Sequence, residues 1–390
     1  MMKGGARVKR LLLLLISLLT LGACVPAHAA ETMTLFAVNV GKADALLLSC
    51  GEATYLIDTG SAESWGQLSC ALRMLGVSHL NGVIVTHTDK DHIGGVPMLA
   101  ASSIPVDAWY ASRYFTEYGA ADHPARLAAK KRGQEVVWLS EGDVIDFPGG
   151  RLTVLSPAEA SKEENDNSLV LLAESAAGRM LLMGDAELPA ERALLERHPD
   201  LPECQVLKVG HHGGDDATSK ALLSLIDPQV AVISTSTEAR PETPAQTVLW
   251  NLAKKGVNVG VTQDGGAGVL VTLENGVATL SLTDWAALPE PVPGIRLTGK
   301  DAKADTVTLT NEGDQMADLS GWFLRSDRGG EVFIFPEGTV LAPGSFLTVG
   351  SLSTNAATDL LWPEKNVWHN KKDDAAQLFD AYGRAIDTLE

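Results

Sequence analysis

Apolar residues recur along residues 32–285 at two different spacings, which predict alternating strands and helices. Short apolar or β-branched runs predict strands that include Thr34 to Val40, Thr54 to Ile57, Val83 to Val85, Leu152 to Leu155, Ser168 to Leu172, Arg179 to Met183, Gln205 to Val209, Val230 to Ile233, Val257 to Val261 and Val269 to Leu273. Apolar residues three and four positions apart predict helices at Ala62 to Leu75, Ala190 to His198, Ser219 to Ile226 and Ala245 to Lys255. This alternation predicts a layered α/β domain in which helices cover the sheets.

The pattern changes at residues 288–294, which read LPEPVPG. The closely spaced prolines preclude a helix and predict an extended linker. Beyond it, short alternating segments are separated by Gly, Pro and Asp turns, which is typical of a small β-sandwich; they lie at Thr306 to Thr310, Gly321 to Ser326, Val332 to Phe335 and Phe346 to Val349. The sequence therefore predicts one domain over residues 31–287 and a second over residues 295–390.

The first thirty residues predict an export signal. Four basic residues within the first ten positions precede the apolar run Leu11 to Leu21, which is too short to span a bilayer. Two processing sites compete: Leu21 to Cys24 resembles a bacterial lipobox, with lipidation at Cys24 and a membrane anchor, and Ala27 to Ala29 fits an ordinary cleavage site of a secreted protein. Both alternatives place the mature protein outside the cytoplasm.

Composition and charge narrow the picture further. The chain has 390 residues and 45% hydrophobic content, which suffices for two or three domains. Loss of the signal, with its four basic residues and no acidic one, changes the formal charge from -18 to -22, and such a surface repels nucleic acid at long range. Cys50, Cys70 and Cys204 then remain, without C-x-x-C spacing. They predict no cysteine zinc site, and a bridge between Cys50 and Cys70 is left open.

Residues 86–95 read THTDKDHIGG and follow the apolar run Val83 to Val85 directly. An H-x-D-x-D-H string arises by chance in a chain of this composition on the order of once in a thousand. On a loop at the end of a strand, this spacing points His87 and Asp89 toward one cation and Asp91 and His92 toward a second. The loop therefore predicts a two-metal site.

Five further motifs accompany this loop. They are NVGKADA at residues 39–45, LIDTG at 56–60, NDNSL at 165–169, LMGDA at 182–186 and KVGHHG at 208–213. In this order the motifs resemble the metallo-β-lactamase superfamily, and in wording they are similar to the hydrolase domain of ComEC-type competence proteins. The resemblance covers roughly residues 32–285. It implies an αβ/βα sandwich with a two-metal site at one edge of the central sheets.

The resemblance also implies a set of site residues. The implied metal ligands are His87, Asp89, Asp91, His92, Asp185 and His212, and the implied catalytic residues are Asp91, Asp185 and His211. Asp185 would bridge both metals, whereas its alternative role is only to cap the helical stretch that starts near Glu187. His212 aligns with the family's ligand, which leaves His211 to donate a proton or to hold a phosphate oxygen. Asp58 would fix the ligand loop by hydrogen bonds, and Asp44 and Lys208 lie near the site with a structural role left open.

Two departures from the lactamase-like pattern bear on function. Asp89 stands where that pattern has its second histidine, as in the ComEC-like branch, which argues against β-lactam hydrolysis. The third histidine of the first metal has no counterpart, because the segment Asn165 to Ser168 occupies its place. The first metal is therefore expected to bind weakly or to complete its shell with water.

These features predict an exported two-metal hydrolase, a phosphodiesterase or nuclease that acts on DNA through metal-activated water. Mixed histidine and aspartate ligands suit zinc or manganese, and the sequence does not choose between them. One alternative is a cell-wall phosphodiesterase that acts on teichoic-acid phosphocholine. The other is a surface binding protein with a degenerate hydrolase fold.

The C-terminal part resembles a lamin-tail domain, an immunoglobulin-like sandwich. The motifs that carry this resemblance are VTLTNEG at residues 307–313, DLSGWF at 318–323, FPEG at 335–338, LAPG at 341–344 and the stretch from Val367 to Gly383. Trp322 within them is expected to pack in the core. The family implies attachment to another macromolecule without saying which.

Overall fold

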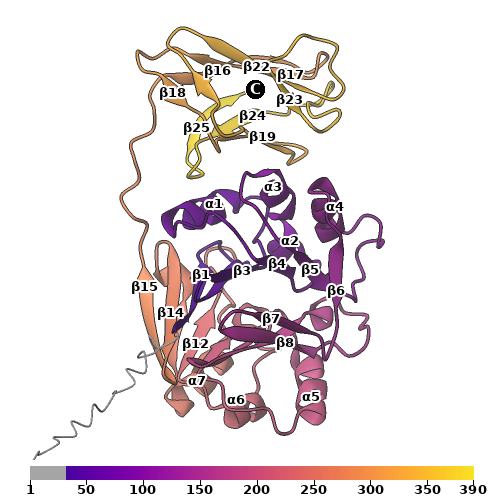
Figure 1. The fold of residues 1–390 in the computed structure, drawn as a ribbon, viewed down its shortest axis with the longest axis vertical. Coiled ribbons are helices and arrows are strands. Elements are labelled where there is room, and N and C mark those ends of the chain that lie inside the picture. Colours follow the sequence, from indigo (N-terminus) through magenta and orange to yellow (C-terminus); the bar gives the residue numbers. More distant parts are fainter. Residues whose placement is uncertain (1–31) are drawn as a thin grey trace, which may run out of the picture.

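The computed structural model describes residues 32–390 (Figure 1). The predicted export signal and the lipidation site at Cys24 lie outside the described residues. Within the described part, every helix is too short or too polar to cross a bilayer.

The first sheet has eight strands in the order β15-β14-β1-β2-β3-β4-β5-β6. Its strands are β1 (Thr32–Val38), β2 (Leu46–Cys50), β3 (Ala53–Ile57), β4 (Gly82–Val85), β5 (Trp109–Ser112), β6 (Val136–Leu139), β14 (Gly268–Glu274) and β15 (Val277–Thr283). Strands β3 to β6 run parallel, and the others pair antiparallel. All four residues of β4 are buried, as a parallel strand covered on both faces requires.

The second sheet has seven strands in the order β13-β12-β11-β10-β9-β8-β7. They are β7 (Val144–Phe147), β8 (Gly150–Ser156), β9 (Val170–Ser175), β10 (Gly178–Leu182), β11 (Val206–Lys208), β12 (Val230–Ile233) and β13 (Asn258–Val261). Strands β10 to β13 are parallel. Each sheet therefore contains a parallel half whose carboxyl ends share one edge.

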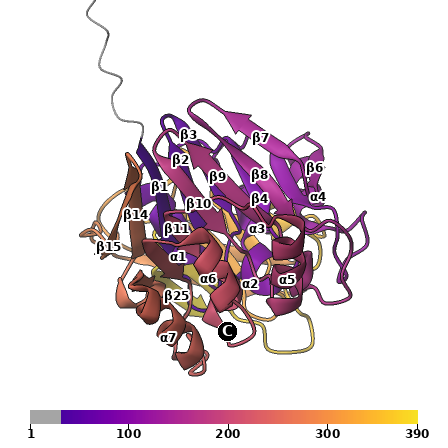
Figure 2. The ribbon, with the colours of Figure 1, turned by 90° about the horizontal axis from the view of Figure 1, so that it is seen from below.

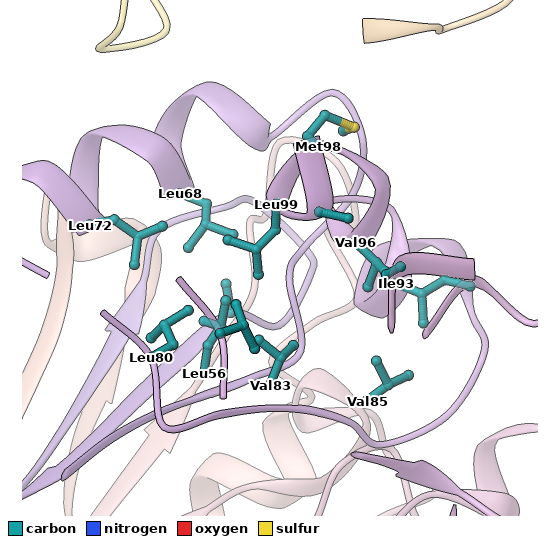
Figure 3. Close-up of a cluster of buried hydrophobic side chains, with 14 of the residues drawn as sticks. Leu56, Leu68, Leu72, Leu80, Val83, Val85, Ile93, Val96, Met98 and Leu99 are labelled. Atoms are coloured by element: carbon teal, nitrogen blue, oxygen red, sulfur yellow. The ribbon is translucent and has the colours of Figure 1, made fainter. Parts of the chain in front are cut away.

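The two sheets face each other, and helices cover their outer faces (Figures 1 and 2). The helices are α1 (Trp65–Met74), α2 (Lys90–Ile93), α3 (Val96–Ala101) and α4 (Pro124–Lys131) over the first sheet, and α5 (Leu188–Arg197), α6 (Lys220–Ile226) and α7 (Gln246–Lys255) over the second. Figure 3 shows Leu68 of α1 and Leu99 of α3 packed over Leu56 and Val83 of the first sheet. A separate buried cluster fills the space between the sheets. The predicted αβ/βα sandwich is confirmed.

The C-terminal part is a β-sandwich, as predicted. Its two four-stranded sheets have the orders β16-β17-β22-β23 and β20-β19-β24-β25, and β18 pairs with β21 in a separate two-stranded sheet. The bounds are β16 (Ile295–Asp301), β17 (Thr306–Asn311), β18 (Ala317–Asp318), β19 (Phe323–Ser326), β20 (Val332–Ile334), β21 (Val340–Leu341), β22 (Phe346–Ser351), β23 (Leu360–Trp362), β24 (Ala376–Phe379) and β25 (Ala385–Leu389). Trp322, Trp362 and Trp368 are buried in its core, so Trp322 packs in the core as expected.

The sandwich is docked on the helices of the first domain (Figure 1). Phe323 of β19 is buried in the same apolar cluster as α1 and α3. The backbones touch at two glycines, because a Cβ atom on Gly66 of α1 would lie 2.8 Å from the Cα of Gly383. The Ser69 hydroxyl also donates to the carbonyl of Ala381 at 3.1 Å. The second domain is thus packed against the first as well as joined to it by residues 288–294.

The cysteines do not form the bridge that the sequence left open. Cys70 in α1 is a buried free cysteine. Cys204 is also buried, and burial raises the pKa of its thiol to about 12. Such a thiol is inert at neutral pH.

Candidate metal centre

The ligand loop leaves the first sheet at the carboxyl end of β4 and enters the short helix α2. Asp58 follows the neighbouring parallel strand β3, so the two chain ends meet at one edge of the sheet. Asp58 accepts hydrogen bonds from the backbone N–H of Thr86 at 2.8 Å and from its hydroxyl at 2.6 Å. The Asp58 carboxylate also lies 2.7 Å from Nδ1 of His92. Asp58 therefore holds the proton on His92 Nδ1 and leaves Nε2 for the site.

The second sheet supplies the opposite wall of the site in the same way. Asp185 follows β10 and His212 follows the adjacent parallel strand β11, so both emerge at one edge. Nε2 of His212 lies 3.1 Å from Oδ2 of Asp185, and Nε2 of His92 lies 3.2 Å from the same oxygen. The two histidine nitrogens are 3.3 Å apart. Glu187 occupies the N-cap of α5, so Asp185 is not that cap.

The remaining predicted ligands lie on either side of this cluster. Oδ2 of Asp91 is 3.4 Å from Nε2 of His212, and Oδ2 of Asp89 is 3.8 Å from Nε2 of His87. The structure thus brings all six predicted ligands together. We name His87 and Asp89 the first position, and Asp91, His92 and His212 the second position; Asp185 lies between them.

Backbone strain marks both walls of the site. Asp58 has a φ of 57°, and His211 and His212 have φ values of 43° and 52°. Residues other than glycine seldom adopt this left-handed backbone conformation, and such strain persists only where the surrounding structure imposes it. The imidazole of His212 is fixed by its Nδ1, which donates to the carbonyl of Ser234 at 2.8 Å. Ser234 follows β12, the next parallel strand.

A buried ion pair lies behind His212. Nζ of Lys208 is 2.8 Å from Oδ2 of Asp44, and both side chains are buried. Oδ1 of Asp44 is 3.7 Å from Nδ1 of His212. Asp44 also meets the ligand loop through its backbone, because its N–H donates to the carbonyl of Asp91 at 3.1 Å. These contacts place Asp44 beside the ligands, as the sequence predicts.

The charges of the site stabilise one another. Burial raises the pKa of the Asp185 carboxyl, but His212 and His92 outweigh this effect and hold it well below its ordinary value. Burial likewise lowers the pKa of His92, but Asp185 and Asp58 outweigh burial and raise it well above its ordinary value. The carboxylates therefore favour positive charge between them. In this way the electrostatics of the site suit a bound cation.

Two buried atoms show that the site fits a metal. Nε2 of His87 and Oδ1 of Asp185 are buried without a hydrogen-bond partner among the described residues. Such orphaned groups are costly unless something satisfies them. Ligand atoms of His87, His92 and Asp185 lie within 4.8 Å of one another, as do those of Asp91, His92 and His212. Imidazole and carboxylate donors in this arrangement fit two divalent cations.

Comparison with known proteins agrees with this geometry. A family model described as the metallo-beta-lactamase superfamily matches residues 38–237. The chain belongs to the metallo-β-lactamase superfamily. A model of the lamin tail domain matches residues 294–390. Both resemblances predicted from the motifs are confirmed.

Two longer bacterial proteins are similar to this superfamily member. ComE operon protein 3 of Bacillus subtilis (strain 168) is 28% identical over 264 residues, which cover 63% of this chain and 34% of the relative. Competence protein ComA of Neisseria gonorrhoeae is 27% identical over 231 residues, which cover 59% of this chain and 31% of the relative. The chain thus spans about a third of the length of these relatives. The crystal structure of the metallo-beta-lactamase fold protein YhfI from Bacillus subtilis aligns with a TM-score of 0.42 and 12% identity, over 62% of this chain and 99% of that one.

His211, the predicted proton donor, lies beside the ligand cluster of this superfamily fold rather than within it. Its Nδ1 is 2.9 Å from Oδ1 of Asp216, and its Nε2 is 3.4 Å from the side-chain amide of Asn165. The imidazole is partly exposed. Its orientation is therefore set by Asp216, a residue that the sequence did not single out.

Several supporting residues were missed by the sequence reasoning. Lys42, whose Nζ is 3.2 Å from Oδ2 of Asp91, and Thr86 lie inside recognised motifs, so their positions carried a signal. Ser234 acts through a backbone carbonyl and carried none. Glu164 binds the ligand loop at Thr88 and directly precedes the segment that replaces the third histidine.

Proposed function

We propose that this chain is a metal-dependent phosphodiesterase that cleaves DNA. The observation that carries the proposal is the convergence of two ligand groups on the buried carboxylate of Asp185. Adjacent cations that share a ligand are typical of enzymes that displace an oxygen at phosphorus. Asp89 in place of a histidine argues against a β-lactamase. The similarity to competence proteins supports DNA as the polymer.

The chain's own residues would hold two divalent ions, zinc or manganese. His87 and Asp89 would bind one, and Asp91, His92 and His212 the other, with Asp185 shared. When bound, such ions lower the pKa of water and offset negative charge on the entering and leaving oxygens. His87, His92, Asp185 and His212 are buried, which excludes bulk water from their ligand atoms. Asp89 and Asp91 are partly exposed and leave the site open to a substrate on that side.

Two residues next to the ligands would act on the substrate directly. Nζ of Lys42 lies beside Asp91 and is partly exposed, so it can neutralise a phosphate oxygen. His211 is held through Nδ1 by Asp216, and its Nε2, 3.4 Å from the side-chain amide of Asn165, would deliver a proton to the departing oxygen from the protonated imidazole. These roles explain how an acidic chain would retain a polyanion at one place on its surface.

We also propose that the mature protein is exported and is anchored through lipid on Cys24. This proposal rests on the basic and apolar pattern of residues 1–24. A lipid-modified cysteine would place the hydrolase on the outer face of the membrane. Mass spectrometry of the mature N-terminus tests it: an N-terminus at Ala30 without an acyl mass would reject the anchor.

A substrate panel tests the function. The chain from residue 31, loaded with zinc or manganese, is expected to cleave linear DNA and the small diester bis-p-nitrophenyl phosphate and to leave a cephalosporin intact. Asp185→Asn keeps the shape of the side chain but removes the charge that the ligands share, so we expect a loss of about a thousandfold or more in the rate. Asp146→Asn serves as the matched control, because its side chain is 78% exposed.

The outcomes separate the alternatives. Hydrolysis of a phosphocholine ester without cleavage of DNA would replace DNA with a wall polymer. Fewer than one bound metal per chain after reconstitution would favour a binding protein with a degenerate site. Parent-like hydrolysis of the small diester by Asp185→Asn would refute the proposed centre.

A further inference from the structure

The carboxylate of Glu164 collects hydrogen bonds from three parts of the chain. One oxygen accepts from the backbone N–H of Thr88 at 2.8 Å and also from the Thr88 hydroxyl. The other accepts from the backbone N–H of Thr116 at 2.7 Å and from its hydroxyl at 2.8 Å. The side-chain amide of Asn167 donates to that oxygen at 3.3 Å. We propose that Glu164 is a positioning residue that fixes the first position in place of the missing third histidine.

Thr88 is the point at which Glu164 would act on the metal ligands. It lies between His87 and Asp89, and two of its groups are tied to the same carboxylate oxygen. A peptide held at both its N–H and its side chain has little freedom, so the flanking Cα–Cβ bonds keep their directions. Asp89 depends on this restraint, since its side chain is 34% exposed and its carboxylate lies no closer than 3.8 Å to His87 Nε2.

The second position is fixed by other partners. Asp58 holds His92, the carbonyl of Ser234 holds His212, and Lys42 contacts Asp91. Glu164 makes none of these contacts. Loss of the Glu164 carboxylate should therefore weaken the first position selectively, which distinguishes a positioning role from a general contribution to stability.

The place of Glu164 in the chain explains why the restraint is needed here. The segment Asn165 to Ser168 occupies the sequence position of the missing histidine and folds as a 3-10 helix over Asn165–Asn167. The next residue, Leu169, donates its N–H to the carbonyl of Thr86 at 3.0 Å. Glu164 and Leu169, which flank the segment, are thus both joined to the ligand loop. Glu164 supplies a hydrogen-bond acceptor to the loop where the family pattern has a histidine that binds the metal.

This inference rests on the two-cation site of the proposed function. Zinc titration against a chromophoric chelator tests the two-cation site and the role of Glu164 separately. For Glu164→Ala we expect the affinity of the weaker site to fall about 10- to 100-fold, as is usual when a support of a metal ligand is lost. The affinity of the tighter site should stay within about threefold of the parent. Glu163→Ala removes an exposed carboxylate from the neighbouring residue and is the matched control, expected to change neither affinity.

A second variant pair assigns the effect to the first position. In a His87→Ala background, which keeps only the second position, Glu164→Ala should have no further effect on zinc affinity. Glu164→Gln keeps the volume but can accept at only one end, so it should lie between the parent and Glu164→Ala. If Glu164→Ala does not fold, Thr88→Val removes one of the donors to the carboxylate and should weaken the first position alone.

The results separate this inference from the proposed function. A parent chain that binds a single zinc ion refutes the two-cation site and with it this role of Glu164. A parent that binds two ions, together with Glu164→Ala or Thr88→Val chains that retain both affinities, refutes the role of Glu164 only. Equal weakening of both positions, or a further loss in the His87→Ala background, would show a structural role instead and would overturn the inference.

Discussion

The buried pair of Lys208 and Asp44 balances charge behind the metal centre, and its removal should be costly. Lys208 is fully buried, and its Nζ lies 2.8 Å from Asp44 and donates to the carbonyl of Val209 at 3.0 Å. Burial raises the pKa of the Asp44 carboxyl, but Lys208, followed by His212, outweighs burial and lowers it below its ordinary value. Asp44 is therefore ionised at neutral pH, and Lys208 is its nearest counter-charge.

The magnitude follows from this burial. Lys208→Met keeps most of the side-chain volume but leaves the Asp44 carboxylate buried and without its partner, which costs about 3–5 kcal/mol of unfolding free energy. Asp44→Asn leaves the ammonium unpaired and should cost a similar amount. The double variant carries no buried charge at this place, so it should be clearly more stable than the sum of the two single losses predicts.

Denaturant unfolding of the full chain measures these differences. Tryptophan fluorescence follows the unfolding of both domains, because Trp65 and Trp109 are buried in the first and Trp322, Trp362 and Trp368 in the second. Lys255→Met is the matched control, because Lys255 pairs with Asp227 at 3.1 Å with both side chains partly exposed, and such pairs contribute about 0–1 kcal/mol. Losses below about 1 kcal/mol for Lys208→Met, or strictly additive single and double variants, would refute the reasoning.

Two further predictions concern the second domain and the pH dependence of stability. Phe323→Ala should lower the free energy of unfolding by about 3–5 kcal/mol and speed proteolysis of the linker at residues 288–294, because Phe323 is buried between the domains and its ring centroid lies 4.7 Å from that of Phe379. Phe346→Ala is the control, because Phe346 is 69% exposed. Equal effects of the two substitutions would contradict the docked arrangement. Burial lowers the pKa of His123 to about 4, below the value of about 6.5 in the unfolded chain. The unfolded state therefore binds a proton more readily, and the free energy of unfolding falls by up to about 3 kcal/mol as the pH falls from 6.5 to 4. His123→Asn keeps an acceptor for the N–H of Ala125 and should flatten this dependence in denaturant midpoints measured across that range; an unchanged slope would contradict it.

Many of the predicted elements coincide with buried segments, although β2 (Leu46–Cys50) is buried and was not among the predicted strands. Val83 to Val85 became β4, and the helix predicted over Ala62 to Leu75 spans Trp65–Met74. Strand β6 was not predicted, because it is an edge strand in which Val137 is 46% exposed and the apolar pattern is weak. Helices α2 and α3 are too short to show a helical period.

The predicted ligands could be found because each lies within a short motif that follows a strand, with Asp91 and His92 already in α2. The residues that hold these ligands in place could not be predicted, because they are far from the ligands in the sequence. Glu164 is 76 residues from Thr88, and the carbonyl of Ser234 is available on any residue type. The orientation of His211 by Asp216 depends on the turn between them, which has no periodic signal.

The docked sandwich changes how the role of the second domain is understood. The resemblance to lamin-tail domains led us to expect attachment to another macromolecule, and a domain on a proline-rich linker would be free to turn toward one. Here the sheet β20-β19-β24-β25 carries Phe323 and Phe379, and these residues pack on the first domain. The opposite sheet, β16-β17-β22-β23, exposes Phe346 and lies away from it (Figure 1). While the domains stay docked, a partner of the sandwich can therefore reach only this outer sheet or the loops. The same contact covers α1 and α3, and α3 follows the ligand loop within a few residues, so the sandwich packs on an element that is directly continuous with the loop that carries four of the predicted ligands.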